Sequence, residues 1–181
     1  MINLKEYIRE ISDFPSEGIK YKDITPLLMD PEAVQEAVAQ FIKLIGDVKI
    51  DKVVGIESRG FFFGMLLAEK LKAGFVPIRK PGKLPYKIHA ESYKLEYGTD
   101  ILEIHQDAIK PGENVILHDD VLATGGTAKA ACNLIGKMGG NIVQCNFLIE
   151  LDFLNGREKI AEHEEKSLLS YRLIQRIFCH P

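Results

Sequence analysis

Residues 115–127 read VILHDDVLATGGT, and this stretch decides the fold. Its three leading aliphatic residues are typical of a strand buried on both faces of a parallel sheet. Two carboxylates, Asp119 and Asp120, stand where that strand should end, and a small, glycine-bearing turn follows. A helix is expected from about Ala128, and its N-terminus would carry about half a positive charge. The stretch therefore predicts acidic side chains beside an anion-binding turn.

Outward from this stretch, short apolar runs predict three more strands, at residues 52–56, 75–79 and 142–151. Helical periodicity between most of them favours right-handed βαβ units, an α/β fold with a central, mostly parallel sheet flanked by helices. Ligands bind beyond the carboxyl ends of such strands. The turns expected at that edge are residues 57–60, 79–85 and 119–127.

The two ends of the chain are less regular. Four apolar residues between positions 4 and 11 recur at helical spacing and predict a short N-terminal helix. Residues 12–30 form an irregular segment with two prolines, and residues 172–181 could extend a helix or fray. A chain of 181 residues, 46% hydrophobic, suits one full-sized core, so we expect a single domain over residues 1–181.

Composition argues against several classes of protein. The net charge of -3, from 23 basic and 26 acidic residues, gives no footprint for nucleic acid or an anionic membrane. The longest apolar run is far below the roughly 20 residues of a membrane span, and we see no leader signature, so we expect a soluble, cytoplasmic protein. Cys132 and Cys145 belong to no C-x-x-C pair and are interpreted as small buried hydrophobic residues.

The motif search leaves the acidic pair as the main signal. No Walker A loop or G-x-G-x-x-G follows any strand, which weakens the NTPase and dinucleotide-binding interpretations. A polar strand end with a helix cap is the plain alternative for Asp119 and Asp120. His118, directly before them, is expected to be a neutral imidazole beside the sheet, because no second histidine or cysteine is near in sequence to complete a metal site.

Residues 115–127 resemble the phosphoribosyl pyrophosphate (PRPP) signature of type I phosphoribosyltransferases. Three further segments narrow the resemblance to the adenine phosphoribosyltransferase family: residues 14–26, 55–61 (GIESRGF) and 79–98, which begin RKPGKLP. The similarity covers about residues 2–171. It implies the type I phosphoribosyltransferase fold, a base-binding hood at about residues 1–30 and a flexible catalytic lid at about residues 80–97.

The resemblance implies a reaction in which adenine and PRPP give AMP and pyrophosphate, in purine salvage, by a homodimer that uses Mg²⁺. The metal would be held mainly by PRPP, pyrophosphate and water, with no dedicated protein ligand and with Asp119 and Asp120 as candidate contacts. The same two aspartates would bind the ribose hydroxyls. The 5′-phosphate would be bound by Ala123, Thr124, Gly125, Gly126 and Thr127.

The remaining implied roles concern the leaving group, the base and catalysis. Pyrophosphate would be bound by Glu57, Ser58, Arg59, Lys80 and Lys83, with a cis peptide at Glu57–Ser58. Adenine would be bound by Ile19, Tyr21, Lys22 and Leu151. The catalytic residues would be Glu96, Arg59 and Lys80. Solvated surface side chains are the plain alternative for Arg59, the lysines and Glu96, and simple packing is the alternative for Ile19.

Two departures and two rival functions stay open. His118 stands where the signature has an aliphatic residue, and Lys22 replaces an expected arginine. A phosphoribosyltransferase for a 6-oxopurine or orotate would keep the phosphate sites and change the base loop. A PRPP-sensing regulator would keep residues 115–127 but would need a nucleic-acid-binding module, for which the sequence offers neither a spare domain nor a basic face.

Overall fold

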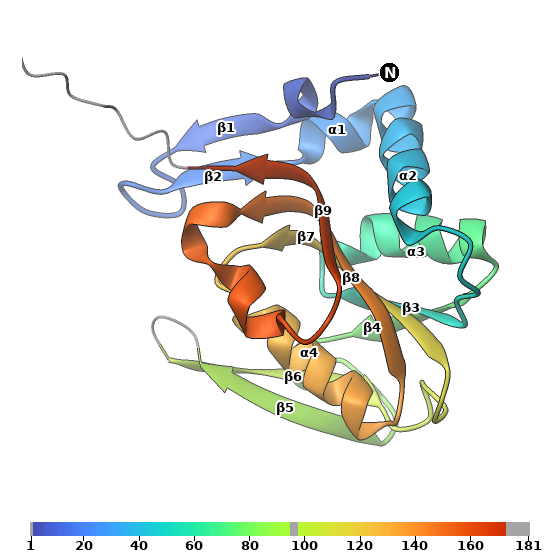
Figure 1. The fold of residues 1–181 in the computed structure, drawn as a ribbon. Coiled ribbons are helices and arrows are strands. Elements are labelled where there is room, and N and C mark those ends of the chain that lie inside the picture. Colours follow the sequence, from blue (N-terminus) through green and yellow to red (C-terminus); the bar gives the residue numbers. More distant parts are fainter. Residues whose placement is uncertain (1, 95–97, 173–181) are drawn as a thin grey trace, which may run out of the picture. The chain divides into compact units, whose positions relative to one another are not determined.

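Five parallel strands form the main sheet of the protein, in a computed structural model that describes residues 2–94 and 98–172 (Figure 1). The strands are β3 (Lys52–Ile56), β4 (Gly74–Ile78), β7 (Asn114–Leu122), β8 (Asn141–Leu151) and β9 (Glu165–Tyr171). Their order in the sheet is β4-β3-β7-β8-β9. This confirms the predicted α/β fold, although β9 was not expected from the sequence. The sheet belongs to the second of two compact units, Met1–Gly46 and Asp47–Pro181.

The helices of the second unit cover opposite faces of the sheet. Every second residue of a strand points to the same face of the sheet. On one face such residues, for example Val54 and Leu117, pack with the apolar side of α4 (Gly126–Lys137) in one buried core. On the other face, Phe75 contacts Phe61 edge to face and reaches α3 (Gly60–Leu71). Both faces being covered explains why the central strands are apolar in continuous runs.

A β-ribbon and two short 3-10 helices complete the second unit. The ribbon pairs β5 (Ile88–Lys94) with β6 (Thr99–His105) in antiparallel fashion, and β5 packs against α4. The 3-10 helices η2 (Asp152–Leu154) and η3 (Gly156–Ile160) connect β8 to β9. The segment interpreted as a lid therefore contains a regular strand, β5. Within it, only the stretch before Ile88 is irregular among the described residues.

The first unit differs from the sequence expectation at its start. It contains η1 (Leu4–Tyr7), β1 (Arg9–Ser12), β2 (Lys20–Asp23), α1 (Thr25–Met29) and α2 (Pro31–Ile45). The predicted N-terminal helix is wrong beyond Tyr7, because the backbone is extended at Ile8 and β1 then pairs with β2. Cross-strand pairing has overridden the local helical spacing. The helix α2 is capped at its start, where the Asp30 side chain accepts from the N–H groups of Glu32 and Ala33.

The strand β7 runs further than the sequence suggested. Its pairing with β3 stops at Gly55↔His118, whereas its pairing with β8 continues to Leu122↔Glu150. Asp119 and Asp120 therefore lie inside the strand rather than after it, next to the end of β3, which no longer pairs with β7 at this level. This difference in length exposes one flank of the acidic pair to the turn that follows β3.

No helix among the described residues is long and apolar enough to cross a membrane.

Candidate active site

The turns after β3, β4 and β7 meet at one edge of the sheet because these strands are neighbours and parallel. The turn after β3 packs tightly on the acidic pair. A Cβ atom added at Gly60 would lie 2.9 Å from Asp119 Oδ1 and 2.9 Å from the His118 carbonyl oxygen. Only glycine permits this approach, and it brings Arg59 next to the two aspartates. The peptide between Glu57 and Ser58 in this turn is cis, as the resemblance implied.

The acidic pair carries unusual electrostatics. Arg59 Nε lies 2.9 Å from Oδ2 of Asp120, a residue with only 4% of its surface exposed. Burial raises the pKa of Asp120, and the Arg59 charge opposes that rise. Burial together with the neighbouring Asp120 charge raises the pKa of Asp119 well above its usual range. Burial and mutual repulsion therefore disfavour two negative charges in this pair, and the Arg59 guanidinium offsets part of that cost.

His118 lies in the sheet directly beside the pair and is fully buried, as the sequence interpretation expected. Its Nδ1 is 2.7 Å from Oδ1 of Asn146, and its ring contacts Phe63 edge to face. Burial lowers its pKa to about 4, although the Asn146 hydrogen bond opposes this. The imidazole is therefore neutral near pH 7, and it adds no charge to the site.

The turn that follows β7 is built from backbone. Gly125 has φ of +75° and occupies the N-cap position of α4, so no side chain there caps the first-turn N–H groups. A pocket of about 70 Å³ is lined by Asp119, Val121, Leu122, Ala123, Thr124, Gly125, Thr127 and Ala128. This pocket joins a carboxylate, two hydroxyl groups and a helix N-terminus in one small volume, which suits an anion carried by a hydroxylated molecule.

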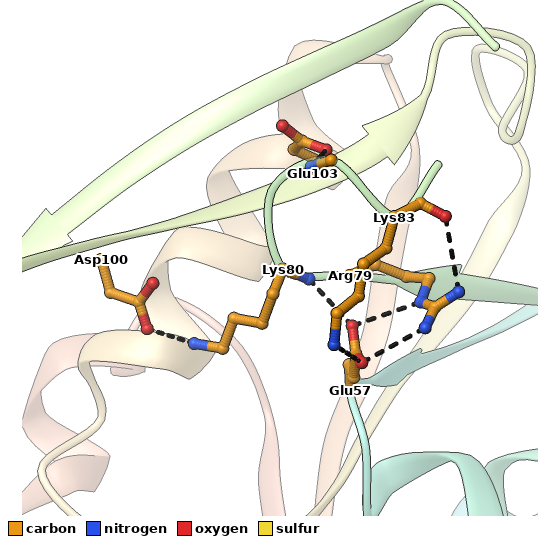
Figure 2. A network of polar contacts seen from close by, with 7 residues as sticks. Glu57, Arg79, Lys80, Lys83, Asp100 and Glu103 are labelled. Carbon is orange, nitrogen blue, oxygen red and sulfur yellow. Dashed lines mark hydrogen bonds and ion pairs between the residues drawn. The ribbon is translucent and has the colours of Figure 1, made fainter. Parts of the chain in front are cut away.

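A carboxylate organises the turn after β4 (Figure 2). Arg79 Nε and Nη2 each lie 3.2 Å from a different oxygen of Glu57, the Lys80 N–H donates to Glu57 over 3.0 Å, and the Lys83 ammonium binds the same carboxylate. Burial opposes ionisation of Glu57, but these donors outweigh it and lower its pKa to about 2. Glu57 is thus a fixed anion that gathers three cationic residues at the sheet edge.

Lys80 is held separately, by the ribbon (Figure 2). Its ammonium binds the carboxylate of Asp100 on β6 and lies 3.0 Å from the hydroxyl of Tyr93, which stands opposite Asp100 on β5. Burial lowers the pKa of Lys80, but these two partners outweigh it, and the net shift is upward. The Gly82 N–H donates to Glu103 over 3.0 Å. We call residues 79–83 the lid segment; acidic side chains hold it at several points.

A larger groove, of about 670 Å³, lies elsewhere on the second unit. Its lining comes mainly from α4 and the start of β8, and it includes none of the residues of the three turns or of the acidic pair. Size alone therefore does not identify the site. The convergence of charged groups does.

Residues 25–177 match the family model described as a phosphoribosyl transferase domain. An adenine phosphoribosyltransferase of Christiangramia forsetii is 65% identical over 94% of this chain and 99% of its own length. The chain belongs to the adenine phosphoribosyltransferase family. Among solved structures, the adenine phosphoribosyltransferase of Thermoanaerobacter pseudethanolicus gives a TM-score of 0.90 at 48% identity, covering 93% of this chain and 98% of that one. The Saccharomyces cerevisiae enzyme, solved with adenine and an imino-altritol bisphosphate, gives 0.88 at 44% identity, covering 92% and 96%.

The residues implied for adenine fall in both units. Ile19, Tyr21 and Lys22 belong to the β1–β2 hairpin of the first unit, whereas Leu151 ends β8 in the second. The hairpin loop contains a cis Phe14–Pro15 peptide, and its Gly18 N–H donates to Asp13 over 2.7 Å. Ile19 is 45% exposed, while the Lys22 ammonium binds Glu10. The Lys22 side chain therefore has a protein partner of its own.

Several residues of the site were not predicted from the sequence or from the family resemblance. Arg79 stood in a matched segment, and its position at the end of a predicted strand could have singled it out. Asp100, Tyr93 and Glu103 gave no local signal, because their placement depends on the register of the β5–β6 ribbon. Glu96 lies outside the described residues, as do residues 173–181 of the uncertain tail.

Proposed function

We propose that this protein transfers the 5-phosphoribosyl group of PRPP to adenine, giving AMP and pyrophosphate in purine salvage. The observation that carries the proposal is the meeting of Asp119 and Asp120, the turn of residues 123–127 and the Arg59 turn at one sheet edge. The family relationship supplies the base and the reaction. It also supports one phosphoribosyltransferase domain, since the matched residues 25–177 span parts of both units.

The two aspartates would act on the ribose. Departure of pyrophosphate leaves an oxocarbenium-like sugar, so acceptors placed at the ribose hydroxyls stabilise developing positive charge. The Arg59 guanidinium binds the Asp120 carboxylate, with Nε 2.9 Å from Oδ2. PRPP would replace both partners of this ion pair. Its ribose hydroxyls would donate to Asp120 in place of the guanidinium, and its pyrophosphate oxygens would accept from Arg59 in place of the carboxylate.

The turn of residues 123–127 would bind the 5′-phosphate. Gly125 and Gly126 would allow its oxygens to approach the N–H groups at the start of α4, and the hydroxyls of Thr124 and Thr127 would donate as well. Because this phosphate does not react, its interactions hold the substrate in place and lower the entropy cost of reaching the transition state.

The lid segment would bind the leaving group. Lys80 and Lys83 would transfer from Asp100 and Glu57 to pyrophosphate, beside Arg59 and Ser58. Glu57, an anion with a pKa of about 2, would repel pyrophosphate directly, so we assign it the task of holding Arg79 and the lid segment in reach. Exclusion of water by this segment would protect the reactive sugar from hydrolysis.

Mg²⁺ would enter mainly with its substrate. Among the described residues no three His, Cys, Asp or Glu side chains are grouped as a metal cage. Two adjacent carboxylates, Asp119 and Asp120, fit the usual protein share of a Mg²⁺ site, in which phosphate oxygens and water supply the other ligands. The bound ion would neutralise charge on pyrophosphate.

The base would be read by the β1–β2 hairpin. Backbone groups of Ile19, Tyr21 and Lys22 offer donors and acceptors for the adenine edge, and Ile19 and Leu151 offer apolar surface. Glu96 would exchange a proton near the adenine N7, a role that rests on the family resemblance. Replacing Glu96 with Gln should depress turnover and leave PRPP binding nearly intact, and unchanged turnover would remove Glu96 from the mechanism.

One assay tests the proposed substrate. Turnover with PRPP and Mg²⁺ is compared for adenine, hypoxanthine, guanine and orotate at equal concentrations. We expect kcat/KM for adenine to exceed the others by at least about a hundredfold, because a site built to pair with a substrate amine leaves buried groups unpaired with the wrong base. A higher kcat/KM for another base would overturn the choice of adenine.

We further propose a cytoplasmic homodimer that uses the outer face of α3. Phe62, Met65 and Leu66 form an apolar stripe at helical spacing and are 46%, 52% and 40% exposed. Sedimentation should give a dimer for the wild type and a monomer for Met65→Glu. Met29→Glu, at a position on α1 that is 76% exposed, is the control and should stay dimeric. A dimeric Met65→Glu variant would exclude this face.

A further inference from the structure

The turn of residues 123–127 rests on a second backbone segment. A Cβ atom added at Gly156 would lie 2.2 Å from the Ala123 carbonyl oxygen and 2.9 Å from the Gly125 nitrogen. A Cβ atom added at Gly125 would lie 2.2 Å from the Gly156 carbonyl oxygen. The two segments therefore touch main chain to main chain, and the position of Gly156 limits where the turn can lie.

Gly156 opens η3, and the next residue, Arg157, fixes that segment to the sheet. Arg157 Nε and Nη2 donate to the two oxygens of Glu150 over 3.0 and 2.6 Å. Arg157 Nη2 also lies 2.7 Å from Glu165 Oε2. Glu150 stands near the end of β8, opposite Leu122 at the end of β7, and Glu165 begins β9. One guanidinium thus ties three elements together beside the turn.

The two glutamates depend on this arginine. Their side chains are only 6% and 3% exposed, whereas Arg157 is 56% exposed. Two buried carboxylates in one cluster repel each other unless a cation lies between them, and a planar guanidinium can serve both at once. Loss of Arg157 would therefore shift η3, and Gly156 with it. At the other end of η3, Ile160 is fully buried in the α4 core and would stay in place.

We infer that Arg157 is a positioning residue for the 5′-phosphate site, acting through Gly156 on residues 123–125. The inference rests on the proposed function in that it takes this turn as the phosphate site. The effect should be selective, because the lid segment is held by Glu57 and Asp100, whereas Arg157 binds Glu150 on β8 and Glu165 on β9. Arg157 should matter for ligands that carry a 5′-phosphate and not for pyrophosphate.

The test measures the Kd of two separate ligands by calorimetry. Ribose 5-phosphate reports on the turn, and pyrophosphate with Mg²⁺ reports on the lid segment. For Arg157→Met we expect the Kd of ribose 5-phosphate to rise at least about tenfold and that of pyrophosphate to change less than about twofold, because an interaction worth a tenfold change is lost at one site only. Steady-state kinetics should show KM for PRPP rising more than kcat falls.

The controls separate positioning from general damage. Arg172→Met removes another arginine ion pair, with Asp152 at 3.0 Å, but both partners are well exposed, and it should change neither Kd. Arg157→Lys keeps the charge without the two-pronged geometry and should raise the Kd of ribose 5-phosphate about threefold. If Arg157→Met does not fold, this lysine variant decides the question.

Each outcome has a separate meaning. An unchanged Kd for ribose 5-phosphate, or equal losses for both ligands, would overturn the inference. If the wild type binds ribose 5-phosphate but makes no AMP, the selective loss would still support Arg157 while the adenine reaction fails. A wild type that does not bind ribose 5-phosphate would overturn both.

Discussion

The turn of residues 123–127 and the lid segment of residues 79–83 would both bind phosphate groups, but they are built in opposite ways. The turn uses small residues and backbone, with Gly125 pressed against Gly156. The lid segment uses charged side chains, and the carboxylates of Glu57 and Asp100 hold them. A group that must only be held suits a rigid backbone cradle, whereas a group that must leave suits side chains with another partner to return to.

The largest effect should come from a methyl group at Gly125. Gly125 and Gly82 have nearly equal φ values of +75° and +76°, so both pay the cost of the left-handed region when replaced by alanine. At Gly82 a Cβ meets nothing within 4 Å, whereas at Gly125 it would lie 2.2 Å from the Gly156 carbonyl oxygen. Backbone atoms cannot move aside as a flexible side chain can.

We therefore expect Gly125→Ala to lower the free energy of unfolding by about 3 to 5 kcal/mol, because the added methyl group both strains the backbone and overpacks against Gly156. The same variant should abolish binding of ribose 5-phosphate. Gly82→Ala should cost only about 1 to 2 kcal/mol from strain alone. Urea denaturation and calorimetry measure both quantities. Equal losses for the two variants would mean that the contact with Gly156 does not limit the turn.

The second largest effect should come from lowering the pH, which should weaken the region around the acidic pair before it weakens the attachment of the lid segment. His118 has a folded pKa of about 4 against an ordinary 6.5, so between these values the unfolded chain binds a proton that the folded chain does not. The free energy of unfolding should fall as the pH drops from 6.5 to 4, by at most about 3 kcal/mol. Glu57, with a folded pKa of about 2 against an ordinary 4.5, stabilises the protein fully above pH 4.5, and this effect is lost progressively as the pH falls from 4.5 through 2.

The measurement is the pH dependence of urea unfolding for the wild type and His118→Gln, without added metal. The variant removes the titrating group, so the difference between the two slopes isolates His118 from the aspartates beside it. A steep slope between pH 6.5 and 4 that persists in His118→Gln would assign the titration to another group. The lid segment should keep its Glu57 anchor throughout this range.

The same contrast explains how much the sequence could tell. The strand, the acidic pair and the turn are contiguous within residues 115–127, so one pattern predicted the strand and the turn, although it placed the acidic pair after the strand rather than inside it. The role of Arg59 came from the family resemblance, while its place after a predicted strand indicated only that it lies at the same edge of the sheet. The partners of the lid segment could not be predicted, because Asp100 and Glu103 reach it through the β5–β6 register. The helix predicted from apolar spacing near the N-terminus was wrong beyond Tyr7 for a related reason, since the pairing of β1 with β2 is not a local property of the sequence.

Removing the charge of Glu57 should have a moderate effect. Glu57→Gln keeps the size of the side chain but weakens its bonds to Arg79 and Lys83, so the lid segment loses its attachment beside the acidic pair. We expect KM for PRPP to rise about tenfold, equivalent to about 1.4 kcal/mol, within the range of charge-assisted hydrogen bonds. Glu69→Gln, on the exposed face of α3, is the matched control. Steady-state kinetics with PRPP varied would contradict this role if the two variants behaved alike.

The smallest effect, and the one with an informative sign, should come from Asp100. Its carboxylate competes with pyrophosphate for the Lys80 ammonium, so Asp100→Asn should lower KM for PRPP. Lys80 and Asp100 are 35% and 28% exposed, and pairs of this kind contribute at most about 1 kcal/mol, so the change should not exceed about fivefold. Asp107→Asn, at an exposed position outside the ribbon, serves as the control. A rise in KM would mean that Asp100 orients Lys80 toward the substrate rather than competing for it, and the lid segment would then resemble the phosphate turn in being built for one fixed geometry.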